Sequence, residues 1–261
     1  MSPLYDALAG QLIGYLPAVA RLAAMAGAAP VFSAGTVPPA VRAALVMAVG
    51  VATCGLVPLA APPPDLGTEG YLLILLGEVL FGLALGLGAR LLLEAFSFAG
   101  QVLDLQIGLQ AGALFDPTSQ QQTTPLGHLY GLFGTVLFLE LGGHHWLLSG
   151  VFDSFRQVPP GQLVLGKGVL ELATGLGTSI FQLAVQITAP ITLTLFLADI
   201  VFGIIARMVP QMNAFLVEMP AKIGLGLLAM AACAPLLFQV GTALLEDLRT
   251  YLQAMVRIAG G

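Results

Sequence analysis

Six apolar segments, each of membrane length, follow one another along this 261-residue chain. A helix needs about 20 apolar residues to cross a hydrocarbon core of about 30 Å, and all six segments are long enough. The pattern predicts an all-α, polytopic integral membrane protein with long helical hairpins bent at prolines. The segments cover residues 10–32, 39–61, 71–98, 126–152, 172–208 and 212–240.

The composition excludes soluble and nucleic-acid-binding proteins. Hydrophobic residues make up 57% of the chain and charged residues 9%, with a mean hydropathy of +0.94. Because a soluble domain carries about 25% charged residues, this chain has too few polar side chains to cover a globule. Nine Lys and Arg stand against fourteen Asp and Glu, so the basic stripe of a nucleic-acid binder is missing and no nucleic-acid partner is expected.

Motifs for catalysis, cofactors or metals are missing from the sequence. No Ser-His-Asp order, P-loop or HExxH is present, so we expect no catalytic residues and no enzyme activity. Residues 224–229 fit a dinucleotide fingerprint as a string, but without a preceding strand they predict no cofactor site. The adjacent His144 and His145 point to different helix faces, so no metal site is expected. Cys54 and Cys233 lie in apolar runs and are predicted to be packing residues.

Small residues recur within the segment 71–98. Gly82 and Gly86 are four positions apart, so they lie on the same face of a helix, and Gly88 and Ala89 follow them. Small side chains let two helices approach closely, so these residues predict a helix-packing face.

Positive charges do not decide the membrane orientation. Lys and Arg normally accumulate on the cytoplasmic side. In this chain four Lys or Arg residues fall on each side of the membrane, and Arg21 in the first apolar segment is not counted on either side. The tie favours a protein whose helices are held chiefly by other proteins. The two sets are Arg156, Lys167, Arg249 and Arg257 against Arg42, Arg90, Arg207 and Lys222.

The C-terminal third is longer than a bilayer requires. The 37 residues of the run 172–208 would extend about 55 Å as a straight helix, nearly twice the hydrocarbon core. Pro190, Pro220 and Pro235 predict bends in a long hairpin. Residues 241–259 carry apolar and charged side chains on opposite helical faces. They predict an amphipathic helix lying on a membrane surface or against a partner.

Ionisable residues within the apolar segments are candidate functional residues. Leaving one against lipid at the helix centre costs at least about 2.5–3.5 kcal/mol. Arg90 with Glu94, and Glu218 with Lys222, are spaced i to i+4, which predicts two local ion pairs. The other carboxylates are predicted to face protein or water, as packing contacts between subunits or as members of a proton relay. They are Glu78, Glu140 and Asp199, and Asp104 is a further intramembrane carboxylate.

Residues 106–117 have the composition of a flexible apolar loop. Glycines at 108 and 112 supply mobility, and bulky apolar side chains can exclude water. The segment ends in an Asp-Pro turn. The alternative is a helix end with ordinary core contacts. The residues concerned are Gly108, Leu109, Gly112, Leu114, Phe115, Asp116 and Pro117.

Several motifs, in order along nearly the whole chain, resemble the flagellar biosynthetic protein FliR family. They include the core pattern in the middle of the chain, the first interhelical turn and the turn of the last hairpin. The matching stretches are Ala29–Phe32, Val37–Pro38, Gly100–Gly108, Phe115–Pro117, Pro125, Gly143–His144, Ser154–Phe155, Pro159 and Arg207–Asn213.

The resemblance implies a subunit of the type III export gate. In that family an N-terminal part resembles FliP and a C-terminal hairpin resembles FliQ. In this chain the FliP-like part would be residues 1–171, which include the loop 99–125. The FliQ-like hairpin would be residues 172–261, which include the amphipathic C-terminal helix. The implied partners are FliP, FliQ, FlhB and FlhA, with exported flagellar proteins as substrates. The implied location is the flagellar basal body in the bacterial inner membrane.

The resemblance also implies that a plug of the channel lies at residues 106–117. Two other functions stay open. An injectisome export subunit shares the ancestry, and a proton-coupled secondary transporter would use Glu78, Glu140 and Asp199 as a relay. A transporter often shows matching interrupted helices in two halves, and no such match is found between 10–98 and 126–240.

Overall fold

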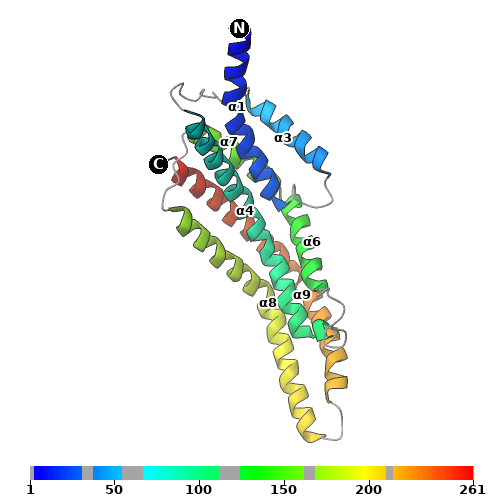
Figure 1. Ribbon diagram of the computed structural model, residues 1–261. Helices are drawn as coiled ribbons and strands as arrows, with labels where there is room; N and C mark the ends of the chain where they lie inside the picture. The colour runs from blue at the N-terminus through cyan, green and yellow to red at the C-terminus, as the bar shows by residue number, and fades with distance from the viewer. Residues whose placement is uncertain are drawn as a thin grey trace. The chain divides into compact units, whose positions relative to one another are not determined.

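The computed structural model describes residues 3–30, 38–54, 67–111, 124–161, 168–209 and 214–260. Within these ranges the chain is helical and contains no strand, so the prediction of an all-α fold is confirmed (Figure 1). A short 3-10 helix, η1, covers Leu109–Ala111. The α-helices are α1 Pro3–Ala28, α3 Pro39–Cys54, α4 Thr68–Ile107, α6 Pro125–Glu140, α7 Gly143–Gln157, α8 Gly168–Met208 and α9 Ala214–Ala259.

Several of these helices are long and apolar enough to cross a membrane. Over the described ranges there are three, in Thr68–Ile107, Thr174–Met208 and Leu216–Ala259, and a fourth if α6 and α7 together form one bent span. A polytopic membrane protein is therefore confirmed. Among the described residues, the candidate spans are fewer than the six apolar segments of the sequence. The 41 residues of α8 and 46 of α9 correspond to about 62 and 69 Å of helix.

The predicted segment 126–152 is not one continuous helix. It is broken between α6, which ends at Glu140, and α7, which begins at Gly143. Gly142 has φ +76° at the break, a left-handed conformation that glycine adopts without a Cβ penalty. Hydropathy does not register a glycine turn, so this break was not predicted, although α6 and α7 together can still form one bent span.

The predicted loop 99–125 begins later than expected. α4 continues to Ile107, and Gly108 with φ +86° follows its last residue, as is common at helix C-termini. Phe96, Leu103 and Ile107 are fully buried at helical spacing. The Gln and Asp residues within 99–107 led to the prediction of a polar loop. The apolar residues between them nevertheless repeat with the period of a helix.

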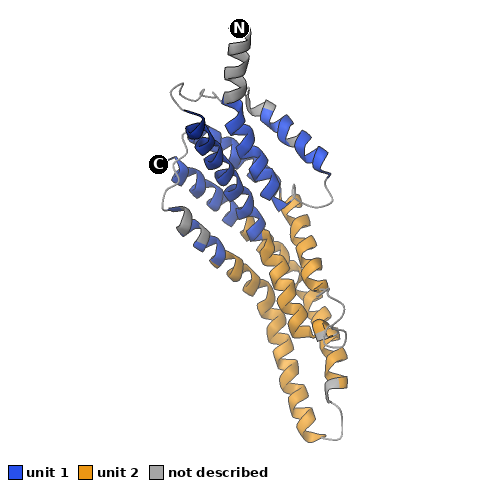
Figure 2. Cartoon of the chain, viewed as in Figure 1, with its two compact units in different colours: residues 1–92, 142–177, 246–261 blue, residues 93–141, 178–245 orange. Residues whose placement is uncertain are grey.

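The chain divides into two compact units, each assembled from separate stretches of sequence (Figure 2). Unit 1 comprises residues 1–92, 142–177 and 246–261, and unit 2 comprises residues 93–141 and 178–245. Residues of α4, α8 and α9 are divided between the two units. The division into FliP-like and FliQ-like parts at residue 171 stays a prediction.

Glycine contacts hold helices closely together within each unit. In unit 1, a Cβ on Gly86 would lie 2.5 Å from the carbonyl oxygen of Met25, and one on Gly82 would meet the carbonyl oxygen of Arg21. The predicted packing face on α4 is therefore confirmed, and α1 is its partner. In unit 2, a Cβ on Gly226 of α9 would lie 2.5 Å from Ile107 of α4.

The C-terminal end of α9 is amphipathic, as predicted. Leu248, Leu252 and Met255 are buried, whereas Arg249 and Arg257 are exposed. The buried face is covered within unit 1 by this chain itself. The expectation that membrane or a partner covers this face was therefore wrong.

Candidate functional site

A buried ion pair joins two helices of unit 1. Arg21 of α1 donates from Nε to the Glu78 carboxylate of α4 at 2.6 Å, and both side chains are fully buried. Its Nη1 atom donates to Ser154 Oγ at 3.0 Å and to the Val158 carbonyl at 3.2 Å. The other Glu78 oxygen accepts the backbone N–H of Gly161 at 2.9 Å. One ion pair therefore links α1, α4, α7 and the turn after α7.

Two aromatic rings enclose the guanidinium of Arg21. Its carbon lies 5.0 Å from the ring centroid of Phe81 and 4.6 Å from that of Phe155. Such cation–π contacts stabilise a desolvated cation. Glu78 thus has its partner within its own chain, so the expectation that it contacts another subunit or belongs to a relay open to water was wrong for this residue.

Sequence reasoning missed Arg21 as the partner of Glu78. The two residues lie 57 positions apart, beyond any helical spacing rule. The charge of Arg21 could have indicated the pair. The free-energy cost of leaving Glu78 against lipid applies equally to an arginine in an apolar segment, so each residue needs a partner.

A second buried carboxylate lies at the start of α6 in unit 2. Asp104 of α4 is fully buried and accepts the backbone N–H groups of Leu126, at 3.1 and 3.2 Å, and Gly127, at 3.0 Å. The residue before α6, Thr124, makes no side-chain cap, so Asp104 caps this helix from a different helix. The carboxylate also complements the positive end of the helix dipole.

Glycines allow α4 and α6 to meet at this cap. A Cβ on Gly100 would collide with the Leu126 carbonyl oxygen, and one on Gly127 would lie 2.8 Å from Gln101. The end of α4 and the beginning of α6 are therefore in direct contact.

We expect Asp104→Ala to destabilise the chain by about 1–3 kcal/mol, because two buried N–H groups lose their acceptor. Asp104→Asn keeps an acceptor oxygen and should cost less. Chemical unfolding of the full chain in detergent would give the free energy of unfolding of each variant. Glu140→Ala, a substitution at an exposed residue, serves as the control. Equal stability of wild type and Asp104→Ala would contradict the capping role.

The predicted loop residues are only partly within the described ranges. Gly108 has a positive φ, and Leu109 begins η1. The remaining five predicted loop residues, Gly112, Leu114, Phe115, Asp116 and Pro117, lie outside the described residues.

Three of the predicted intramembrane charges lie on the surface of the chain. Arg90, Glu94 and Glu140 are exposed, and the described residues form no ion pair between Arg90 and Glu94. The predicted Arg90–Glu94 pair was wrong, because i to i+4 spacing permits a contact between two flexible side chains without enforcing one.

Asp199 belongs to a cluster of charges in unit 2. Lys222 of α9 contacts Asp199 of α8 and, at 3.4 Å, Glu218 one turn earlier on α9. The predicted Glu218–Lys222 pair is confirmed, and Asp199 joins it. This partly exposed cluster contains two carboxylates, of Asp199 and Glu218, and one ammonium group, of Lys222. Around it, the two helices expose large apolar side chains, among them Leu193, Phe196, Leu197, Ile200, Leu225 and Leu228.

Comparison with known proteins connects these features to one family. Residues 12–248 match the family described as bacterial export proteins, family 1. The flagellar biosynthetic protein FliR of Bacillus subtilis is 34% identical over 182 residues, covering 68% of this chain and 70% of that protein. FliR of Escherichia coli is 29% identical over 219 residues, with 83% and 82% covered.

A secretion protein shows a comparable similarity. The secretion system apparatus protein SsaT of Salmonella typhimurium is 30% identical over 166 residues, covering 63% of this chain and 64% of SsaT. The family match extends over most of the sequence, including both the Arg21–Glu78 pair and the Asp104 cap. The chain therefore belongs to family 1 of the bacterial export proteins, the family of the flagellar biosynthetic protein FliR.

Proposed function

We propose that this chain is a non-enzymatic subunit of the flagellar type III export gate. It would assemble with FliP and FliQ into the channel for unfolded flagellar proteins, in the inner membrane at the basal body, with FlhB and FlhA as further partners. The observation that carries the proposal is the family match over residues 12–248. The Salmonella SsaT similarity supports an injectisome export subunit as the second candidate.

Exposed apolar helix surface supports a subunit role. In unit 2, α8 and α9 expose many large apolar side chains along residues 181–208 and 216–238. The helices α8 and α9 are each about twice as long as a hydrocarbon core. Lipid cannot cover the whole apolar length of an upright helix this long. We therefore expect other subunits to pack against the apolar surface of α8 and α9 that lies outside the hydrocarbon core.

The paired carboxylates favour a channel subunit over a proton-coupled transporter. Glu78 is locked to Arg21, and Asp199 contacts Lys222. A proton relay needs carboxylates that can exchange their partners and reach water. Of the three relay candidates, only the exposed Glu140 keeps a side chain without such a charged partner in the described part of the chain.

The channel closure predicted at residues 106–117 is proposed to begin at Gly108, because Gln106 and Ile107 are the last residues of α4. Asp104 of α4 holds the beginning of α6, so the two helices that flank the proposed closure are fastened to each other. Gly108, with its positive φ, supports a sharp departure of the chain from α4. The apolar side chains of Leu109, Leu114 and Phe115 would exclude water from the closed channel.

We expect the full chain to co-purify with FliP and FliQ from the same genome when the three are co-expressed. Production of the chain alone should give a lower yield, because apolar surface stays uncovered. The measurement is the amount of chain recovered by affinity purification through tagged FliP, with an unrelated polytopic membrane protein as control. A stable solitary chain that fails to co-purify would refute the gate-subunit proposal.

A further inference from the structure

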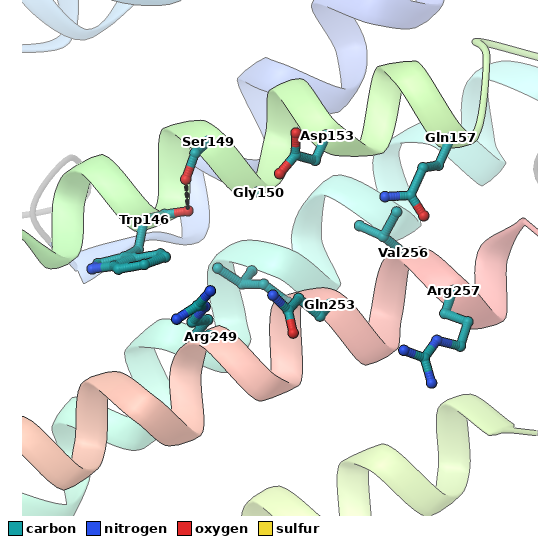
Figure 3. Close-up of a pocket in the computed structure, with 10 residues that line it drawn as sticks. Trp146, Ser149, Gly150, Asp153, Gln157, Arg249, Gln253, Val256 and Arg257 are labelled. Atoms are coloured by element: carbon teal, nitrogen blue, oxygen red, sulfur yellow. Dashed lines mark hydrogen bonds between the residues drawn. The ribbon is translucent and has the colours of Figure 1, made fainter.

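A groove between α7 and the end of α9 in unit 1 plays no part in the export proposal. It has a cavity volume of about 360 Å³. Trp146 and Asp153 lie on the α7 side, and Arg249, Gln253 and Arg257 lie one turn apart on the α9 side (Figure 3). Polar residues of both helices therefore line the groove, with Arg249 beside Trp146 and the Arg257 side chain directed away from α7 (Figure 3).

The bottom of the groove is apolar. Leu252 and Val256 of α9 line it and are buried. Gly150 lets the helices approach, since a Cβ there would lie 3.1 Å from Leu252. An apolar floor below polar walls suits a ligand that is itself amphiphilic.

The charges of the groove are unbalanced in favour of anions. Arg249 and Arg257 stand against the single carboxylate of Asp153, and the described residues form no ion pair among these three. Arg249 stacks on Trp146, with 4.8 Å between the guanidinium carbon and the ring centroid. A stacked guanidinium keeps its in-plane N–H groups for an acceptor such as phosphate.

The sequence of α9 places Arg249 close to a membrane surface. Residues 223–245 contain no charged side chain, and this run corresponds to about 35 Å of helix, close to the thickness of a hydrocarbon core. Arg249 follows about 6 Å later along the helix, at the depth of lipid headgroups. Trp is enriched at this depth, and basic pockets between membrane helices bind anionic headgroups.

We propose that this groove binds the headgroup of an anionic phospholipid. Arg249 holds the phosphate and Arg257, two turns further along α9, adds positive charge at the rim, while Leu252 and Val256 contact the apolar carbons beneath it. The apolar floor and the neighbouring charge-free run favour a lipid over an acidic polypeptide segment. Asp153 opposes the anion and limits the affinity.

Binding is measured by native mass spectrometry of the full chain in uncharged detergent. The probes are phosphatidylglycerol, phosphatidylcholine and inorganic phosphate. Phosphatidylglycerol should bind preferentially, and Arg249→Gln or Arg257→Gln should each weaken it about fivefold. Arg207→Gln removes an exposed arginine in the last turn of α8 and should leave binding unchanged.

Asp153→Asn should tighten phosphatidylglycerol binding, again about fivefold, a gain that loss of folding cannot produce. Equal binding of both lipids, or insensitivity to the Arg249 and Arg257 substitutions, overturns the proposal. Inorganic phosphate that competes as well as the lipid would show a simple anion site and also overturns it. So does polyglutamate binding with the same arginine dependence while phosphatidylglycerol fails to bind.

Discussion

Cells that carry the chain with residues 109–115 deleted should have a resting membrane that leaks ions. The deletion removes the apolar closure, whereas Asp104 still fastens the beginning of α6 to α4. The gate complex should therefore assemble at normal levels but stay open. Membrane conductance, measured beside the amount of assembled complex, would show an increase well outside the wild-type range.

Point substitutions give a matched comparison within the same loop. Leu114→Gly with Phe115→Gly should reproduce the leak, because bulky side chains that exclude water are lost. Gln121→Gly with Gln122→Gly changes the same loop without removing apolar side chains and should leave conductance unchanged. Wild-type conductance at normal complex levels in the deletion would rule out the plug assignment while leaving the gate-subunit proposal intact.

Breaking the Arg21–Glu78 pair should destabilise the chain by about 3–5 kcal/mol. Arg21→Leu or Glu78→Leu alone leaves an uncompensated charge in a fully buried place. The double substitution removes both charges and should recover a large part of the loss. Unfolding of the full chain in detergent, followed by denaturant titration, gives the free energies for the cycle.

The exposed Arg156 on α7 provides the control for this cycle, and Arg156→Leu should change stability by less than about 0.5 kcal/mol. Additive losses in the double variant would show that the two residues act independently. That outcome would leave Ser154 and the aromatic rings as the principal contacts of Arg21.

The all-α membrane fold was predictable because hydropathy and helical period are properties of neighbouring residues. The close-packing glycines of α4 and the amphipathic end of α9 followed from the same local spacing. The Glu218–Lys222 pair lies one helical turn apart and was predictable for that reason. The break at Gly142 had a local signal in two consecutive glycines, which the apolar character of the segment outweighed.

Tertiary structure alone decided which charges meet. Arg21 finds Glu78 across 57 positions, and Asp104 caps α6 from another helix, because packing brings the elements together. It also decided that Arg90 and Glu94 stay apart and exposed, although their spacing suggested a pair. Sequence determines which residues cannot be left in lipid, but the partner that removes that cost is chosen by three-dimensional proximity, which local spacing does not encode.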